Sequence, residues 1–189
     1  MSTKKPTIET ELQTLQRESF CYFLHETNPA NGLVKDKTEP GWPASIAATG
    51  FGLAAYPVGI ERGFILRTVA VERTLATLRF FWNSPHGPQP DATGYQGFYY
   101  HFLDLKTGRR AWQCELSTVD SAFLLAGMLT ARSYFDANTE EEQEIRTLAD
   151  ALSRIFHSGI EQRSGEGVRR LDITQPNENA IHRFLWDRL

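Results

Sequence analysis

The sequence is poor in the features that define a metal site or a disulfide framework. Its two cysteines, Cys21 and Cys114, lie in unrelated contexts and lack the paired spacing of a zinc site or a disulfide-rich domain. We expect both to be reduced, buried thiols. The five histidines are spread along the chain without a short repeated interval. The sequence therefore predicts no metal site and no other cofactor.

An excess of one charge is also missing, as is a long apolar run. The 20 basic and 23 acidic side chains are well mixed and leave a formal net charge of -3, so we expect no nucleic-acid partner. The first fifteen residues contain lysines without an apolar stretch behind them, unlike a secretory signal. As written, the sequence predicts a cytoplasmic protein with no membrane span.

Hydrophobic periodicity predicts five helices in a single domain of 189 residues. The first covers about residues 8–26, with Leu12, Leu15 and Phe23 on one face. The second follows Pro43 and is rich in alanine and glycine, which indicates an inner helix packed closely by neighbours. The fourth and fifth begin after Ser117 and Thr139, two residues that favour helix N-caps.

The third predicted helix, from Thr68 to about residue 82, has the clearest amphipathic stripe. Val71, Leu75, Leu78 and Trp82 recur at helical spacing, with charged residues around them. We therefore expect these four side chains to face the core together. Replacing Trp82 with a charged residue should then cost about 3 kcal/mol or more.

Two segments lack a helical pattern. Residues 94–113, GYQGFYYHFLDLKTGRRAWQ, combine aromatic residues with a turn-forming Lys-Thr-Gly-Arg stretch, which predicts an extended, hairpin-like excursion between helices. Residues 157–189 are rich in glycine, arginine and polar residues and have no sustained stripe, so we expect a poorly packed tail. The pattern favours antiparallel helical pairs over a parallel sheet.

Two carboxylates, Glu115 and Asp120, stand at the start of the fourth predicted helix. If Ser117 is the N-cap, Asp120 falls at the third helical position, where a carboxylate completes a cap and favours the positive end of the helix dipole. Glu115 would then be a solvated loop acid. On this interpretation both acids have a purely structural role.

The functional interpretation is that the two acids act on a sugar. Glycoside hydrolysis uses a pair of carboxyl groups, and sugar rings often stack on aromatic faces. The aromatic residues near the acids in the sequence are Trp82, Tyr95, Phe98, Tyr99, Tyr100 and Trp112. His101 and Asp104 are further polar candidates, although a hairpin turn also explains Asp104.

Four phrases resemble one bacterial family closely. They are SIAATGFGLAAYPVGIERG, TLRFFWNSPHGP, GFYYHFLDLKTGRRAW and CELSTVDSAFLLAGML. The family is the glucoamylase-like family, which includes endo-β-1,2-glucanases and relatives of a domain of cyclic β-1,2-glucan synthases. The resemblance spans about residues 12–152. It implies an all-α (α/α)6 toroid of antiparallel helical hairpins around an acidic cleft, with Glu115 and Asp120 in the family's Glu-Leu-Ser-Thr-x-Asp phrase.

The chain departs from this family in length. An (α/α)6 toroid has twelve helices, whereas five are predicted here. The family's later Gly-Tyr-Asn/Asp-Glu phrase, whose glutamate suits a proton donor, is not found in the sequence. We therefore expect residues 1–156 to form the amino-terminal half of such a domain, with exposed inner helix faces that favour self-association or a partner. Full-length relatives could be periplasmic or secreted.

The leading hypothesis is a fragment of a glucan-acting glycoside hydrolase, of the β-1,2-glucanase or glucoamylase-like kind, that is inactive alone. Glu115 and Asp120 are its candidate catalytic acids, and the candidate residues that bind a glucan oligosaccharide or polysaccharide are Tyr99, Tyr100, His101 and Trp112. A non-catalytic carbohydrate-binding or interaction protein is the alternative. A structural helical domain with both acids as caps is a third.

Overall fold

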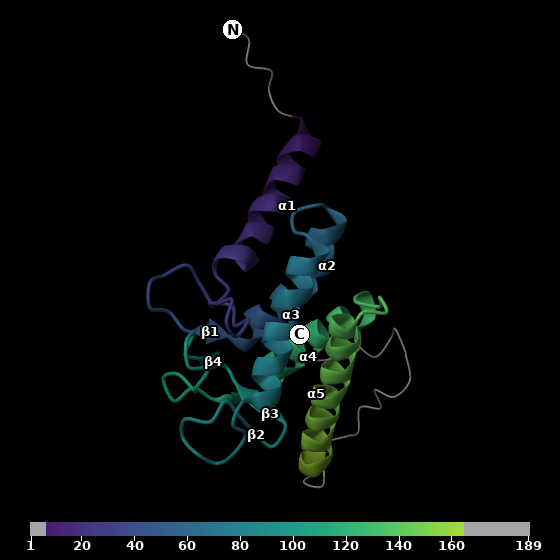
Figure 1. Ribbon diagram of the computed structural model, residues 1–189. Coiled ribbons are helices and arrows are strands. Elements are labelled where there is room, and N and C mark those ends of the chain that lie inside the picture. The colour runs from purple at the N-terminus through teal and green to yellow at the C-terminus, as the bar shows by residue number, and fades with distance from the viewer. Residues whose placement is uncertain (1–6, 165–189) are drawn as a thin grey trace.

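The computed structural model describes residues 7–164, which contain five helices and five short strands (Figure 1). The helices are α1 (Ile8–His25), α2 (Ile46–Glu61), α3 (Arg67–Asn83), α4 (Thr118–Tyr134) and α5 (Glu140–Ser164). The strands are β1 (Ala44–Ser45), β2 (Gly94–Tyr95), β3 (Phe98–Tyr100), β4 (Phe102–Leu103) and β5 (Leu116–Ser117). None of these helices has the length and apolar character of a membrane span.

Helix α5 runs past residue 156, where the sequence suggested that the folded half ends, and residues 165–189 of the expected tail lie outside the described part of the chain. Its start is as predicted, because the Thr139 hydroxyl accepts a hydrogen bond from the Glu142 amide at 3.3 Å. The predicted N-cap of α4 is also present. The Ser117 hydroxyl accepts from the Asp120 amide at 3.2 Å.

The predicted excursion between α3 and α4 consists of antiparallel strands that lie beside the helices (Figure 1). Strand β3 pairs with β2 on one side and with β5 on the other, while β4 pairs with β1. A two-residue turn joins β2 to β3 through Gln96 and Gly97, which both have positive φ as tight hairpins require. Strands β1 and β5 belong to two separate small sheets and lead directly into α2 and α4, so each sheet fixes where one of these helices begins.

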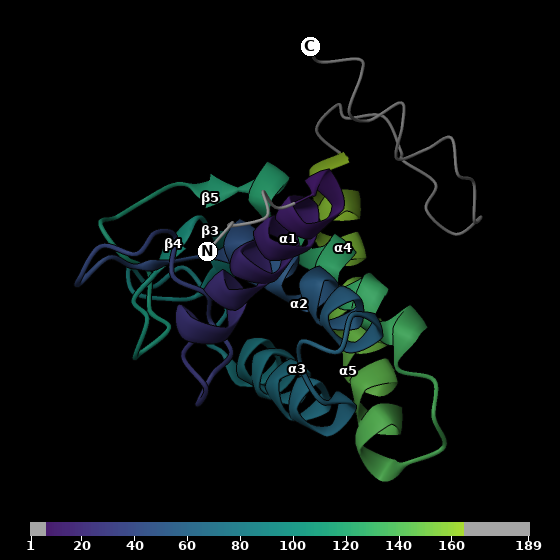
Figure 2. The same ribbon diagram turned by 90° about the horizontal axis from the view of Figure 1, so that it is seen from above.

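Helices α2 and α4 pack against each other at unusually short range because glycines face each other. A Cβ atom added at Gly50 would collide with the backbone of α4, and one added at Gly127 would collide with the backbone around Gly50. Figure 2 shows α3 and α5 side by side across from α1. The all-α fold is confirmed, with the glycine-rich second segment as a closely packed inner helix.

The stripe predicted for α3 is confirmed at three of its four positions. Val71, Leu75 and Leu78 are buried, but Trp82 is 49% exposed and Phe81 beside it is 1% exposed. The reason is that the last turn of α3 packs against the strands, where the Phe81 ring lies 4.8 Å from the Tyr99 ring. The predicted inward position of Trp82, and the large cost of a charge there, are therefore wrong.

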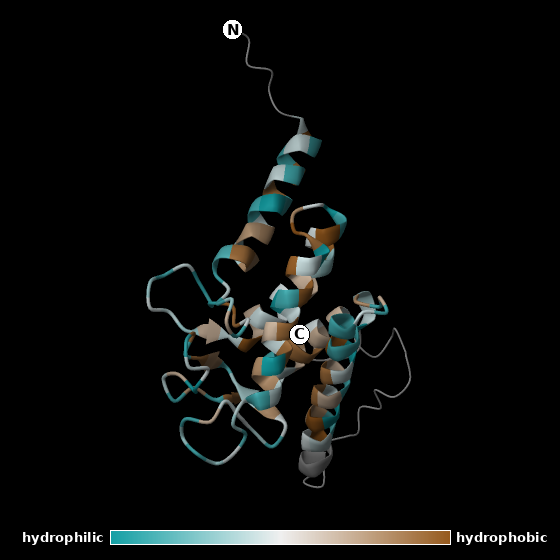
Figure 3. Cartoon of the chain, in the orientation of Figure 1, coloured by the Kyte–Doolittle hydropathy of each residue, from teal (hydrophilic) through white to brown (hydrophobic). Residues whose placement is uncertain are grey.

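The first half of α1 projects away from the rest of the described structure (Figures 1 and 3). Leu12 and Leu15 do share one face of the helix, but both are exposed. The only buried residue of the helix is Phe20, whose ring meets Phe64 at 5.7 Å, and the Arg17 guanidinium lies over the same Phe64 ring at 4.8 Å. Apolar periodicity identified this helix correctly but does not show which of its turns has a packing partner.

Two arginines on α3 join this helix to α5. Arg67 pairs with Glu142 at 2.8 Å, and the Glu142 carboxylate is almost fully buried while also accepting a hydrogen bond from the Ala137 amide. Arg79 pairs with Glu144, and both of these side chains are well exposed. Hydrogen bonding from Arg67 lowers the pKa of Glu142 below its usual value.

We predict that Arg67→Ala destabilises the protein by about 2 kcal/mol or more, because it leaves a buried carboxylate without its counter-ion. The matched change Arg79→Ala should cost about 1 kcal/mol or less, since its pair is exposed. Chemical denaturation at pH 7 measures both. Because the folded-state pKa of Glu142 is lowered, its contribution should fade as the pH falls through that value; equal costs for the two variants would contradict this account.

Candidate functional site

The two candidate acids and His101 come together because β3 pairs with the segment that precedes α4. Tyr99 lies opposite Ser117 and Tyr100 opposite Leu116. The pairing continues for one more residue, since the His101 amide donates to the Glu115 carbonyl at 3.1 Å. Backbone hydrogen bonds therefore fix His101 and Glu115 side by side, and the first turn of α4 brings Asp120 next to them.

Asp120 is both a helix cap and a member of this cluster. Its carboxylate accepts a hydrogen bond from the Ser117 hydroxyl at 2.6 Å, while that hydroxyl accepts from the Asp120 amide. The same carboxylate oxygen, Oδ2, lies 3.5 Å from Nδ1 of His101. The structural and functional interpretations of Asp120 are therefore compatible.

His101 bridges the two acids. Its Nδ1 atom lies 2.7 Å from Oε1 of Glu115, and the three side chains can each place one polar atom within 4.8 Å of the other two. The hydrogen bond from His101 is the main cause that lowers the pKa of Glu115. Glu115 is thus held as an ionised carboxylate, and 66% of its side chain is exposed to solvent.

Only this group of three, within the described residues, brings together enough side chains of the right type to hold a metal ion. Two ligands of one tetrahedral zinc ion lie roughly 3.3 Å or more apart, given zinc–ligand bonds of about 2.0–2.2 Å. The 2.7 Å between Nδ1 and Oε1 is shorter and is an ordinary hydrogen-bond distance. The short contact between His101 and Glu115 is therefore a hydrogen bond and not a pair of bonds to one shared metal ion.

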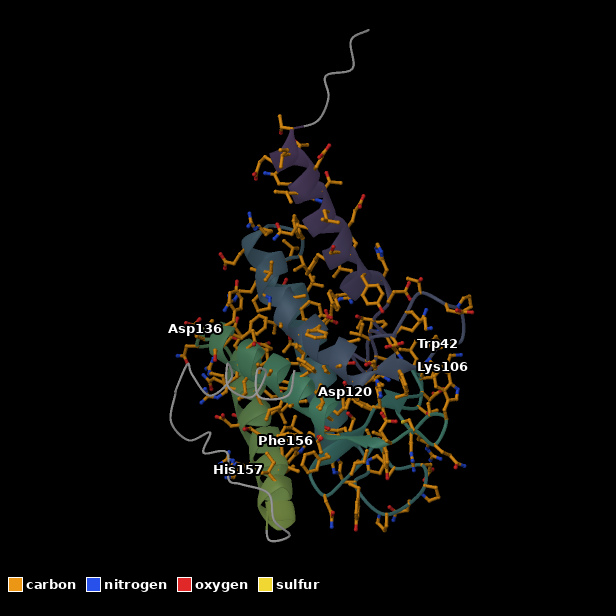
Figure 4. The ribbon with its side chains drawn as sticks, turned by 180° about the vertical axis from the view of Figure 1, so that it is seen from behind. Trp42, Lys106, Asp120, Asp136, Phe156 and His157 are labelled. Atoms are coloured by element: carbon orange, nitrogen blue, oxygen red, sulfur yellow. The ribbon has the colours of Figure 1, made fainter. Side chains whose placement is uncertain are left out.

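An aromatic cluster continues from His101 along one side of the acids. The imidazole stacks on Phe102 with ring centroids 4.0 Å apart, and Phe102 meets Trp112 at 5.4 Å. Trp112 in turn contacts Trp42 edge to face at 4.9 Å. Figure 4 shows Trp42 among the loops and Asp120 where α4 begins.

Trp112 is held in a fixed place although 59% of it is exposed. It is supported by Phe102 and by Trp42, which is anchored by an indole hydrogen bond to Asp36 at 3.2 Å and covered by the Lys37 ammonium, 3.8 Å from its ring centre. Such an aromatic face, rigid and open to solvent, can stack on a sugar ring.

The four predicted sugar-binding residues therefore separate into two groups. His101 and Trp112 lie at the surface beside the acids. Tyr99 is 5% exposed and packs against Phe81 and His86 in the core, where burial raises the pKa of its hydroxyl. Tyr100 is half-buried beneath the guanidinium of Arg110.

Sequence reasoning missed Trp42 and Phe102. Trp42 lies in the loop between α1 and β1, 70 residues before the tryptophan it supports. Its position after a glycine in a loop carries no periodic signal. Phe102 has the alternating context of a strand, which does not distinguish a core residue from a support for a surface ring.

No family model matches the sequence. The chain is nevertheless similar to one curated protein and to several solved structures. The exo-β-1,2-glucooligosaccharide sophorohydrolase (non-reducing end) of Parabacteroides distasonis is 34% identical over 158 residues, which is 80% of this chain and 21% of that protein. A glucoamylase-like structure from Bacteroides uniformis superposes with a TM-score of 0.70 at 33% identity, covering 82% of this chain and 37% of the other.

A third match is the β-1,2-glucanase structure from Parabacteroides distasonis, with a TM-score of 0.72 at 30% identity over 83% of this chain and 22% of that one. The described helices thus form part of an (α/α)6 fold of the glycoside-hydrolase type. The chain is a homologue of glucoamylase-like and β-1,2-glucanase proteins, and it spans between about a fifth and two fifths of the length of these relatives.

We predict that His101→Ala raises the pKa of Glu115 toward its ordinary value, because the hydrogen bond that stabilises the carboxylate is lost. An NMR titration of the Glu115 carboxyl carbon measures this directly. The control is His25→Ala. His25 is an exposed residue at the C-terminal end of α1, and its replacement should leave the titration of Glu115 unchanged. An unaltered Glu115 titration in His101→Ala would show that the imidazole does not hold the acid.

Proposed function

We propose that this chain provides one wall of a cleft that binds and cleaves β-1,2-linked glucans, and that the wall alone binds such glucans without cleaving them. The observation that carries the proposal is the exposed Trp112 face next to the cluster of His101, Glu115 and Asp120, in which His101 is hydrogen-bonded to Glu115. The names of the homologues support the linkage, since two of them act on β-1,2-linked glucose.

The arrangement of the acids defines their role. A glycosidase needs two carboxyl groups on opposite sides of one glycosidic bond, about 5–5.5 Å apart in retaining enzymes and about 6.5–9.5 Å apart in inverting ones. Here both carboxylates face one nitrogen of His101, Nδ1, which lies 2.7 Å from Glu115 and 3.5 Å from Asp120. Because the two acids converge on one edge of the imidazole, we infer that both act from the same side of a substrate.

The charge state of Glu115 points to the same role. Its pKa is lowered rather than raised, whereas a general acid needs a carboxyl group that keeps its proton near neutral pH. Glu115 and Asp120 are suited to accept hydrogen bonds from a sugar hydroxyl or from a water molecule that attacks the bond. We infer that Glu115 is not the proton donor of the reaction.

Trp112 supplies the binding energy on this wall. A pyranose ring placed on its open face would lie beside the acids, because the ring contacts run without a break from Trp112 through Phe102 to His101. Stacking on one aromatic face gives weak binding by itself. A carbohydrate-binding protein without turnover, the alternative function, would use the same surface.

We predict that the purified chain binds β-1,2-gluco-oligosaccharides weakly and releases no reducing ends from them. Trp112→Ala should weaken binding by about tenfold, because the stacking surface is lost. Isothermal titration calorimetry gives the affinities, and a reducing-end assay on β-1,2-, β-1,3- and α-1,4-glucans tests turnover.

Trp82→Ala is the matched control, because Trp82 is an exposed tryptophan near the end of α3 and is not part of this aromatic cluster. This variant should bind like the parent. Turnover that disappears in Glu115→Gln would overturn the proposal that this wall is inactive alone. An absence of any β-1,2-glucan binding would remove the sugar-binding role.

We also infer that the inner helices present a face for association. Phe51 and Val58 on α2 and Val119 on α4 are about half exposed, and the Phe51 ring contacts Phe123 of α4 at 5.3 Å. Residues 46–60 contain no charged side chain, and a helix that is apolar on every face is normally buried on every face. In the isolated chain, this apolar face can be covered by the same face of a second copy of the protein.

We predict that the chain forms dimers as its concentration rises and that Phe51→Ser shifts it toward the monomer. Leu66→Ser, at a residue 72% exposed just before α3, is the control and should dimerise like the parent. Analytical ultracentrifugation over a range of concentrations distinguishes these outcomes. A parent protein that stays monomeric throughout would exclude self-association through this face.

A further inference from the structure

The turn that carries Trp112 has an unfavourable backbone. The Cys114 amide donates to the Ala111 carbonyl at 3.0 Å, which closes a tight turn around Trp112 and Gln113. These two residues have φ angles of 54° and 51°. Glycine and asparagine are the residues that adopt such a left-handed turn readily, whereas other residues adopt it only at an energetic cost. Some other interaction must hold the turn in this shape.

Arg110 makes that interaction. Its Nε atom donates to the Cys114 carbonyl at 2.6 Å, and its Nη2 atom donates to the Gln113 carbonyl at 2.7 Å. The guanidinium also lies over the Tyr100 ring, 4.2 Å from its centre. One planar group thus binds two consecutive carbonyls of the turn and stacks on strand β3, a geometry that suits the fixed fork of arginine.

The backbone of Arg110 is itself anchored. Arg110 forms an antiparallel bridge with Leu103, which is completely buried, and the Ala111 amide donates to the Phe102 carbonyl at 2.9 Å. The guanidinium therefore connects a fixed point of the sheet to the far side of the turn. Without it, the two carbonyls would have only solvent as a partner.

The turn stands between the two parts of the proposed site. Trp112 is its second residue, and the Cys114 carbonyl belongs to the peptide group that leads into Glu115. By fixing that carbonyl, Arg110 sets where Glu115 leaves the turn and meets His101. Its positive charge also contributes, after His101, to the lowered pKa of Glu115.

We propose that Arg110 is the positioning residue of the site: it holds the Trp112–Gln113 turn in its left-handed conformation and thereby places the sugar-stacking ring and the Glu115 carboxylate on one wall. This inference rests on the proposed glucan-binding function for its purpose. The geometric part, that Arg110 orders the turn, can be tested without any sugar.

The test compares Arg110→Lys with Arg109→Lys. Lysine keeps the charge but cannot reach both carbonyls with one planar group. Arg109 is the neighbouring residue, and its side chain forms an exposed ion pair with Asp91. The Trp42–Trp112 contact supplies a readout, because two indoles 4.9 Å apart couple in the far-ultraviolet circular dichroism spectrum. The signal is the spectrum of each protein minus that of its Trp42→Phe derivative.

Arg110→Lys should lose at least about half of the coupled tryptophan signal, raise the pKa of Glu115 in an NMR titration, and bind β-1,2-gluco-oligosaccharide about tenfold more weakly. Arg109→Lys should match the parent in all three. Adding Gln113→Gly to Arg110→Lys should recover part of the coupled signal, because glycine accepts the positive φ angle. That recovery separates an ordered turn from a general loss of fold.

An Arg110→Lys protein that keeps both the tryptophan signal and the lowered Glu115 pKa would overturn the inference. If the parent binds no β-1,2-glucan while these two spectroscopic changes still occur, the sugar-binding function fails and the positioning role of Arg110 stands. If binding weakens without either spectroscopic change, Arg110 contacts the sugar directly and the positioning role is wrong.

Discussion

The pairing of β3 with β5 is the interaction on which the site depends. These strands are only three and two residues long, yet they join the excursion after α3 to the residue that caps α4. Every polar group of the site is placed relative to this ladder: His101 follows β3, Glu115 precedes β5, and Asp120 lies one turn into α4. A slip of one residue would turn His101 away from the acids, because strand side chains alternate between faces.

The first turn of α4 does more for the site than place Asp120 beside His101. Asp120 is held by the Ser117 hydroxyl and lies in the first turn of α4, where the helix dipole favours a negative charge. A carboxylate that completes a cap is held in a fixed position by the helix itself. The cap therefore places Asp120 where it can accept a hydrogen bond, so its structural role as a cap does not conflict with the functional role proposed for it.

Much of the fold could be predicted from the sequence, because its signals are local. Apolar periodicity, a run of small residues after Pro43 and N-cap residues together located all five described helices, and the Ser117 cap with Asp120 three residues later was readable from spacing. Trp82 shows the limit: the stripe places it with Leu78, but the strands that pack on the last turn of α3 favour Phe81 instead. The neighbours of a helix end are set by tertiary contacts that no window of sequence contains.

The site itself was predictable in part for the same reason. Glu115, Asp120, His101 and Trp112 lie within 20 residues of one another, so a local reading grouped them. Trp42 contacts Trp112 only because β1 pairs with β4, across nearly 60 residues of sequence. Tyr99 was grouped with the surface rings because an aromatic run gives no indication of which side chains point inward.

The apolar face of α2 and α4 lies next to the acid cluster, and no part of the described residues covers it. Val119, half exposed on that face, is the residue next to Asp120. Any helical layer that covered Phe51 and Val119 would also exclude water from the edge of the acid cluster. Charges interact several times more strongly once water is excluded. The contact that buries the apolar face would therefore also strengthen the electrostatic attraction of Glu115 and Asp120 for a positive charge that develops on a substrate. Folding and catalysis would then depend on the same interface.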